Sequence, residues 1–299
     1  MAKIIECIPN FSEGRNQHVI DTLASCVRSF PGVALLDYSP DPNHNRSVFT
    51  LIGEPGGVAE AVFAMSKLAK ELIDLTKHTG EHPRIGAVDV IPLVPIREAT
   101  AADCIQLSKI IGARIGNELN IPVFLYEDSA TAEHRRNLAF IRKGQFEGMP
   151  EKLKRPEWAP DYGPRQVHPT AGAVAVGARM PLIAFNANLS TSDVRIAKKI
   201  AKIVRGSDGG LKYCKAIGVM LKDRNTAQVS MNMVNYEGTS LYRALELIRI
   251  EAARYGAHVI GTELIGLSPA KALIDCAAYY LQIENYDYEK QVLENYLWA

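Results

Sequence analysis

The chain has 299 residues, of which 47% are hydrophobic and 22% are charged, and its formal net charge at pH 7 is +1. These values are typical of a globular protein with a sizeable core. A charge this small provides no strong field to attract nucleic acid or an acidic membrane surface, and no apolar stretch approaches the ~20 residues of a membrane span. We therefore expect neither nucleic acid nor a membrane as a partner.

The first third of the chain alternates between predicted strands and helices. Residues 3–8 predict a strand, and the spacing of apolar residues within 16–30 predicts a helix. Strands at 33–38 and 46–52 flank a turn rich in Pro, Asp and Asn. A helix at 56–75 and a strand at 88–94 complete the order β-α-β-β-α-β, which is the split-βαβ or ferredoxin-like unit.

A polar segment, residues 78–89, stands just before the last of these strands. Its His78-x-x-Glu81-His82 pattern matches the inverted zinc-peptidase motif, which requires both histidines on one helix. Gly80 disfavours that helix, and Pro83 pushes His82 out of the helical region. We therefore expect no metal at this site.

Acid–base chemistry is the second interpretation of the same segment. A histidine on a stiff His-Pro link transfers protons near neutral pH when polar groups orient it. Glu81 or Asp89 could orient the ring of His82, and Arg84 could hold a substrate carboxylate with two hydrogen bonds. A polar surface loop without a function is the third interpretation, and the segment alone does not choose between these.

The middle of the chain adds elements to the first unit. A helix is predicted at 100–119 with Thr100 as its N-cap, followed by an edge strand at 122–126 and a helix at 130–143. Residues 144–177 show little periodicity and carry five prolines. Long irregular segments in compact folds are usually functional or disordered. We expect an ordered loop that covers a ligand, and a surface linker is the alternative.

The last third repeats the order β-α-β-β-α-β. The expected fold is therefore α/β (α+β), with two ferredoxin-like βαββαβ sandwiches packed together, over residues 1–178 and 179–299. The predicted elements are a strand at 181–186, a helix from Asp193 to 204, strands at 216–221 and 227–233, a helix at 240–255, a strand at 258–265 and a helix at 268–283.

Several sequence strings resemble one known family, the formiminotransferases, whose members are glutamate formimidoyltransferases. The resemblance runs from the first predicted strand to the last predicted helix. The strings are ECIPNFSEG at 6–14, NRSV at 45–48, GEHPRIGAVDV at 80–90, residues 153–163, FNANL at 185–189, AQVS at 227–230 and LIGL at 264–267.

The resemblance implies an activity. Members of the family transfer the formimidoyl group from N-formimidoyl-L-glutamate to tetrahydrofolate, without a metal, in histidine degradation. It implies that His82 is catalytic, that residues 1–178 form the N-terminal subdomain carrying it, and that residues 179–299 form the C-terminal subdomain. The residues implied to line the folate site are Gly163, Pro164, Arg165, Gln166, Val167, His168, Pro169, Thr170, Ala171 and Gly172.

Further expectations concern the side chains around His82. Both substrates carry carboxylates, so Arg46, Arg84 and Arg165 are candidate anchors. His44, in the turn of the first unit, is a further candidate orienting group beside the two carboxylates already named. In animals the family's module is fused to a cyclodeaminase, and we expect a stand-alone form because the sequence ends at Ala299.

Two alternative functions remain. Residues His168 and Ala171 depart from the bulky or apolar residues of the family, which motivates a related folate enzyme that uses a formyl donor or 5-formyltetrahydrofolate. A non-catalytic ligand-binding module of the same fold is the other alternative, because fold does not fix function. We also expect a homodimer, and a cytoplasmic location because the five scattered cysteines form no disulfide pattern.

Overall fold

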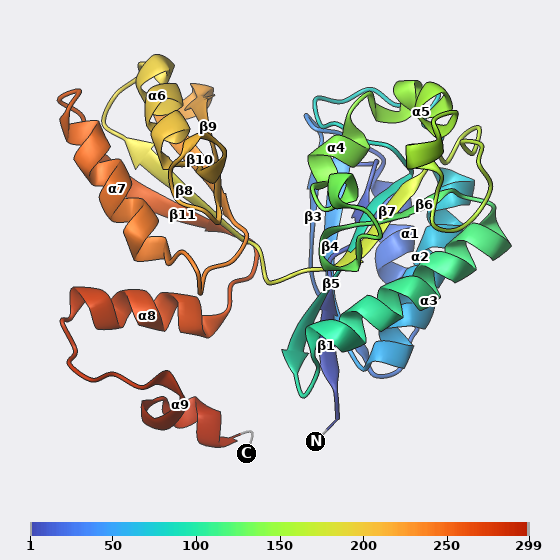
Figure 1. The fold of residues 1–299 in the computed structure, drawn as a ribbon, viewed down its shortest axis with the longest axis horizontal. Coiled ribbons are helices and arrows are strands. Elements are labelled where there is room, and N and C mark those ends of the chain that lie inside the picture. The colour runs from blue at the N-terminus through green and yellow to red at the C-terminus, as the bar shows by residue number, and fades with distance from the viewer. Residues whose placement is uncertain (1, 298–299) are drawn as a thin grey trace. The chain divides into compact units, whose positions relative to one another are not determined.

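The computed structural model describes residues 2–297 and has a mixed α/β architecture with two sheets (Figure 1). The chain divides into two compact units that meet between Arg179 and Met180. Each unit contains its own sheet and its own buried core. The two units are therefore described separately.

Unit 1 is built on a seven-stranded sheet. Strands β1 and β2 both lie between β4 and β5, β3 pairs with the outer side of β4, and β7 and β6 follow β5. The pairs of β7 with β5 and β6 are parallel, and the other pairs are antiparallel. The strands are β1 (Ile4–Cys7), β2 (Asn10–Phe11), β3 (Val33–Asp41), β4 (Arg46–Gly53), β5 (Val88–Arg97), β6 (Val123–Leu125) and β7 (Val174–Ala178).

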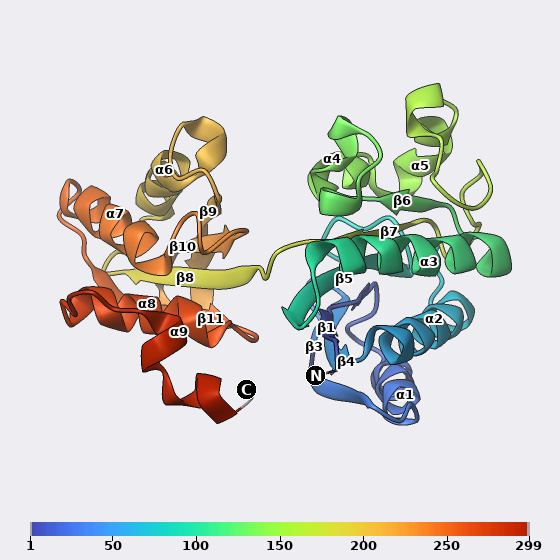
Figure 2. The same ribbon diagram turned by 60° about the horizontal axis from the view of Figure 1, so that its bottom comes forward.

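Three long helices cover one face of this sheet: α1 (Gln17–Arg28), α2 (Pro55–Leu72) and α3 (Ala101–Leu119) (Figure 2). The predicted N-cap of α3 is confirmed, because Thr100 accepts the backbone N–H of Asp103, and Asn16 caps α1 by accepting that of His18. The apolar stripes of the helices enter the main core, where each fully buried large side chain contributes roughly 1.5–3 kcal/mol.

The other face of β5 and β7 is covered as well, by α4 (Leu138–Arg142) and α5 (Gln145–Leu153) (Figure 2). Ile141 and Met149 from these helices pack with Phe124 of β6 in a second apolar cluster. All five residues of β7 are buried, so that strand shows no alternation of polar and apolar residues. Both faces of the sheet therefore carry cores next to the polar segment before β5.

Two sequence predictions in this region are wrong. The predicted helix at 130–143 is helical only in a short 3₁₀ turn and in α4, because Arg135 is held by tertiary bonds to Asp161 and to backbone carbonyls. The segment 144–177 is not irregular throughout, since it contains α5 and β7. Helix α5 contains Pro150, and its first turn is tied to the rest of the unit by a bond from the Phe146 N–H to the Arg84 carbonyl.

Unit 2 is a four-stranded antiparallel sheet in the order β11-β8-β10-β9. Helices α6 and α7 supply apolar residues to its core, whereas α8 contributes one buried residue, Ala272. The elements are β8 (Ile183–Leu189), α6 (Val194–Val204), β9 (Cys214–Leu221), β10 (Thr226–Met233), α7 (Leu241–Ala253), β11 (Val259–Ile265), α8 (Ala270–Tyr280) and α9 (Tyr288–Gln291). Within residues 2–297 no helix combines the length and the apolar composition needed to cross a membrane.

Candidate active site

Three polar segments of unit 1 meet at one place: the chain after β2, the turn between β3 and β4, and residues 78–89. Asn45 joins them, because its side-chain oxygen accepts the Gly14 N–H at 3.0 Å and its side-chain nitrogen donates to the Thr79 carbonyl at 3.0 Å. Asn45 is buried and has a φ of 48°, a conformation that asparagine tolerates better than most residues. This residue therefore fixes the β3–β4 turn against the segment that carries His82.

The close approach of these segments depends on Gly80. A Cβ at this position would lie 2.3 Å from the carbonyl oxygen of His44, a backbone atom that cannot move without shifting the turn. We predict that Gly80→Ala displaces the turn and lowers kcat by at least about tenfold, which corresponds to about 1.4 kcal/mol in the barrier. The matched control is Gly56→Ala in α2, where a Cβ meets open space. Equal initial rates for the two variants would contradict this packing.

His82 lies in this junction and is partly buried. Its ring centroid is 6.3 Å from that of His44, and the two rings are nearly perpendicular at 76°. Burial, and then the charges of Arg46 and Arg142, lower the pKa of His82 from 6.5 to about 3. The imidazole is therefore neutral at physiological pH and free to accept a proton.

The lowered pKa of His82 has a consequence for stability. The unfolded chain binds a proton below pH 6.5 and the folded site does not until about pH 3, so stability falls as the pH drops through this window. We predict that His82→Asn removes part of this loss, on the order of 1–2 kcal/mol between pH 6.5 and pH 4 once partial exposure is allowed for. Urea denaturation at both pH values measures it, with His18→Asn on the exposed side of α1 as control. Parallel pH dependences for both variants and the unchanged protein would be the opposing result.

Arg46 is the cation beside His82. Its guanidinium donates to the side-chain oxygen of Asn10, and its Nε–H is buried without a hydrogen-bond partner among residues 2–297. Burial and the charge of Arg142 lower its pKa to about 10, so it remains a cation at physiological pH. A partly buried cation with an unused donor favours an anionic ligand group nearby.

Asp89 makes its contacts with groups other than His82. One of its oxygens accepts the Ile85 N–H at 2.8 Å, and the other accepts Nε of Arg142 at 2.9 Å and its Nη2. Asp89 is 1% exposed and the Arg142 side chain 15%, so this is a buried ion pair. Its influence on His82 passes through Arg142 and the backbone of the segment.

Arg84 is occupied by protein groups. Its guanidinium forms a two-pronged pair with Glu147, at 2.6 and 2.9 Å, and its Nε donates to Nδ1 of His78 at 3.1 Å. The other nitrogen of His78 lies 2.8 Å from the Asn45 carbonyl, and we assign it as the donor. Arg84 therefore supports the loop from α5, and the geometry favours a positioning role over binding a substrate carboxylate.

The zinc-peptidase interpretation requires a helix through residues 78–82, and this segment is irregular. No group of three or more His, Cys, Asp or Glu side chains in the described part of the chain is arranged to hold a metal ion.

The predicted folate-lining stretch, residues 163–172, lies beside the same segment. Three backbone hydrogen bonds of 2.8–2.9 Å tie its end to the chain around His82: Leu75 N–H to Thr170, Ala87 N–H to Ala171 and Ala173 N–H to Ile85. Gly172 permits this contact, because its φ is 72° and a Cβ would lie 2.1 Å from the Ile85 carbonyl oxygen.

Individual residues of this stretch differ in their surroundings. Nδ1 of His168 accepts the Ala171 N–H at 3.0 Å, and burial and Lys70 lower its pKa. Arg165 donates to the carbonyls of Leu153 and Lys154, which end α5, so two of its donors are used. The remaining positions are partly buried or exposed, apart from buried Ala171 and Gly172: Gly163, Pro164, Gln166, Val167, Pro169 and Thr170.

Several residues of the cluster were not predicted from the sequence. Asp41, Arg142, Glu147 and Asn10 all contact predicted site residues. Only Asp41 carried a local signal, since an Asp three residues before His44 in a Pro-rich turn is typical of a capped turn. Glu81, which was predicted, has an exposed side chain, and its backbone N–H donates to the Asn43 carbonyl at 3.3 Å.

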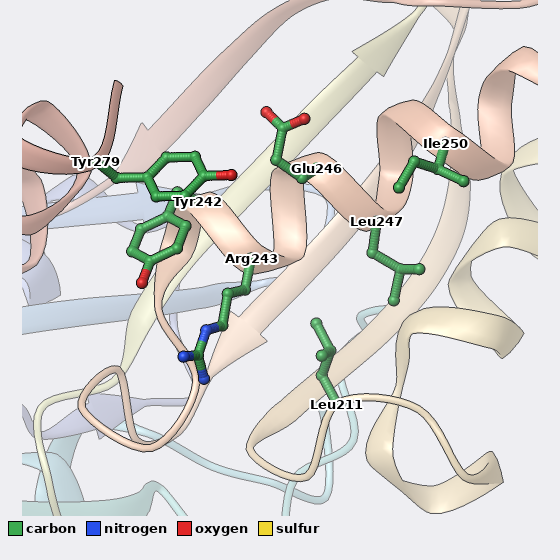
Figure 3. Close-up of a pocket in the computed structure, with 7 residues that line it drawn as sticks. All are labelled: Leu211, Tyr242, Arg243, Glu246, Leu247, Ile250 and Tyr279. Atoms are coloured by element: carbon green, nitrogen blue, oxygen red, sulfur yellow. The ribbon is translucent and has the colours of Figure 1, made fainter. Parts of the chain in front are cut away.

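Unit 2 contains separate polar and concave features. Gln228 of β10 donates to Asn188 of the neighbouring strand β8 at 2.8 Å and to Glu263 of β11, one strand further on, at 3.0 Å. A pocket of about 460 Å³ lies along α7 and α8, where the rings of Tyr242 and Tyr279 stack at 4.1 Å (Figure 3). None of the pocket's lining residues is one of the predicted site residues.

Known proteins resemble the whole chain. A family model for the formiminotransferase domain, N-terminal subdomain, matches residues 4–179, and one for the formiminotransferase domain matches residues 184–294. Glutamate formimidoyltransferase of Streptococcus pyogenes serotype M1 is 66% identical over 99% of both chains, and that of Thermoplasma acidophilum is 47% identical over 97% of this chain and 96% of its own. Formimidoyltransferase-cyclodeaminase of Mus musculus is 45% identical over 95% of this chain, which covers 53% of that protein. The chain belongs to the formiminotransferase domain family.

Proposed function

We propose that this chain is an enzyme that transfers the formimidoyl group from N-formimidoyl-L-glutamate to tetrahydrofolate, releasing L-glutamate and 5-formimidoyltetrahydrofolate. Membership of the family and the name of a relative that is 66% identical supply the reaction. The observation in the site that carries the proposal is a neutral, partly buried His82 beside the cation Arg46. This combination suits proton transfer next to an anionic substrate.

The reaction needs the movement of one proton between two nitrogen atoms. The folate N5 forms a bond to the formimidoyl carbon, and the C=N π electrons move onto the terminal nitrogen, which gives a tetrahedral intermediate. N5 then loses its proton, the electron pair on the terminal nitrogen re-forms the C=N bond, and the bond from carbon to the glutamate nitrogen breaks. The glutamate nitrogen keeps the electron pair of that bond and gains a proton. A base that accepts the first proton and an acid that supplies the second together complete the transfer.

His82 is the base in this proposal. An N5 attached to an aromatic ring system becomes strongly acidic once it carries the new bond, so a weakly basic imidazole is sufficient to remove its proton. The imidazolium of His82 is disfavoured by burial and by Arg46, so it returns its proton readily. Tetrahydrofolate takes part as a co-substrate, and no metal is needed for these steps.

Arg46 is the proposed anchor for a substrate carboxylate, because its side chain is partly buried and one of its donors has no partner in the described chain. Glu81, which precedes His82 in the chain, has an exposed side chain and is the proposed orienting carboxylate for the ring. The stretch 163–172 is the proposed folate-lining segment, supported by its backbone bonds to the chain around His82. Arg84 and Arg165 act by holding α5 against these loops.

The finer fold assignment is also a proposal. We assign residues 1–178 to an N-terminal subdomain that carries the catalytic histidine, and residues 179–299 to a C-terminal subdomain, each with a ferredoxin-like core. The antiparallel strand orders β5-β1-β4-β3 and β11-β8-β10-β9 support it. We further propose that the protein is a homodimer. We also propose that it is located in the reducing cytoplasm, which the free state of all five cysteines supports.

Initial-rate assays with tetrahydrofolate and two donors, N-formimidoyl-L-glutamate and N-formyl-L-glutamate, test the function. The proposal expects glutamate release with the formimidoyl donor to exceed that with the formyl donor by at least about a hundredfold, with or without chelator. A preference for the formyl donor would instead support the related folate enzyme, and tight folate binding without turnover would support a binding module.

A further inference from the structure

The β3–β4 turn holds a second histidine in a fixed orientation. One oxygen of Asp41 accepts the backbone N–H groups of Asn43 at 2.8 Å and of His44 at 3.0 Å, and the other oxygen pairs with Nδ1 of the His44 ring. Burial alone would raise the pKa of Asp41, but these hydrogen bonds from His44 and Asn43 lower it overall. Asp41 is therefore an ionised carboxylate that holds the imidazole by one nitrogen and leaves Nε2 free.

The His44 ring faces the junction that contains His82. The two ring centroids are 6.3 Å apart in an edge-to-face arrangement, and 46% of the His44 side chain is exposed. At this separation, a small group such as an amidine can contact one ring while the second ring lies within reach of the same group. The Asp41–His44 pair repeats the relation of carboxylate to histidine that orients imidazoles in general acid–base catalysis.

The charged side chains near the β3–β4 turn come from the segments that contact it. Arg15 donates to the Pro42 carbonyl at 2.8 Å, Arg46 follows the turn directly, and Glu81 belongs to the segment bonded to Asn43. Arg142 acts on both Arg46 and His82. In this largely cationic surrounding, Asp41 is the carboxylate in direct contact with the His44 ring.

The reaction needs a base for the N5 proton and an acid for the departing glutamate nitrogen, and a single histidine is poorly placed to serve as both. His82 is neutral in the resting site and has no proton to give when the substrates bind. It gains one only after N5 has reacted, and it must then change its contact from the attacking nitrogen to the departing one. A second imidazole already oriented on the other side of the carbon removes that need.

We propose that His44 is a second catalytic residue, which donates a proton from Nε2 to the departing glutamate nitrogen while His82 accepts the proton of the attacking N5. The inference rests on the proposed function. One proton moves from N5 to His82 and one from His44 to glutamate, so the pair ends with His82 protonated and His44 neutral. Proton exchange with water restores both rings for the next cycle.

The test compares the dependence of kcat on pH in the full-length protein and in His44→Asn. His44→Asn is expected to lower kcat by about 10–100-fold with KM changed less than about threefold, and to abolish the alkaline limb of the profile. Asp41→Asn keeps an acceptor for the two backbone N–H groups but loses the charged partner that orients the His44 ring. It is therefore expected to lower kcat in the same direction as His44→Asn, but by less.

The outcomes separate the inference from the proposed function. His18→Asn, which changes an exposed histidine of α1, is the control and should retain the rate and both limbs. A His44→Asn variant with kcat within twofold and an unchanged alkaline limb overturns the role of His44 alone. A loss of rate through KM only, with both limbs retained, also overturns it. Absence of transfer by the unchanged protein overturns the proposed function and this inference together.

Discussion

Replacing His82 by alanine is expected to lower kcat by about 10²–10⁴-fold while leaving tetrahydrofolate affinity within about threefold. The reason is that the neutral imidazole is the proposed base for the N5 proton, and alanine leaves only water to accept it. His82 is partly buried and lies in a loop, so its removal disturbs little packing.

Single-turnover kinetics and fluorescence titration with tetrahydrofolate measure the two quantities separately. His78→Ala is an informative comparison, because His78 supports the same loop through Arg84 and Asn45. That variant should lose rate through a displaced loop and also lose thermal stability. If His82→Ala kept kcat within threefold of the unchanged protein, His82 would not be the base.

Replacing Asp89 by alanine is expected to cost about 3–5 kcal/mol of the free energy of unfolding. Asp89 is buried, and its removal leaves the guanidinium of Arg142 without its partner and the Ile85 N–H without its acceptor. The uncompensated Arg142 also remains close enough to repel Arg46. This large effect arises from an unpaired buried charge, not from the strength of the pair itself.

A double-mutant cycle separates these contributions. Arg142→Met combined with Asp89→Ala removes both charges, and we expect the double variant to recover about half of the loss. Urea denaturation followed by circular dichroism measures all variants, with Asp21→Ala, an exposed carboxylate of α1, as the control. A cost below about 1 kcal/mol for Asp89→Ala would mean that the pair does not support the site.

Local sequence signals predicted the elements whose own residues determine them. Helix α1 follows from its apolar spacing, and the order of the predicted strands and helices in both units follows from periodicity and turns. Helix α5 was missed because Gly148 and Pro150 oppose a helix, and its bonds to Arg84 depend on a segment about sixty residues away. Strand β7 was missed because burial on both faces removes the alternation by which strands are recognised.

The residues of the candidate site likewise divide into those that were predicted from the sequence and those that were not. His82 and the stretch 163–172 were predicted from the resemblance to a known family, and Arg46 was predicted from the carboxylates of the implied substrates. The partners of Asp89 and Arg84 were not predictable, because Arg142 and Glu147 come from the misassigned middle of the chain. Which carboxylate contacts which cation is decided by tertiary packing, and the sequence contains no local pattern for it.

Transfer of a labelled carbon tests the central claim most directly. N-formimidoyl-L-glutamate labelled with carbon-13 at the formimidoyl carbon is mixed with tetrahydrofolate and the full-length protein, and the products are followed by NMR. The account predicts that the label appears on the folate, with one glutamate released per label transferred, and that His82→Ala slows its appearance by about 10²–10⁴-fold. Label that stays on the donor, or that is released to water as formamide or formate, would contradict the account.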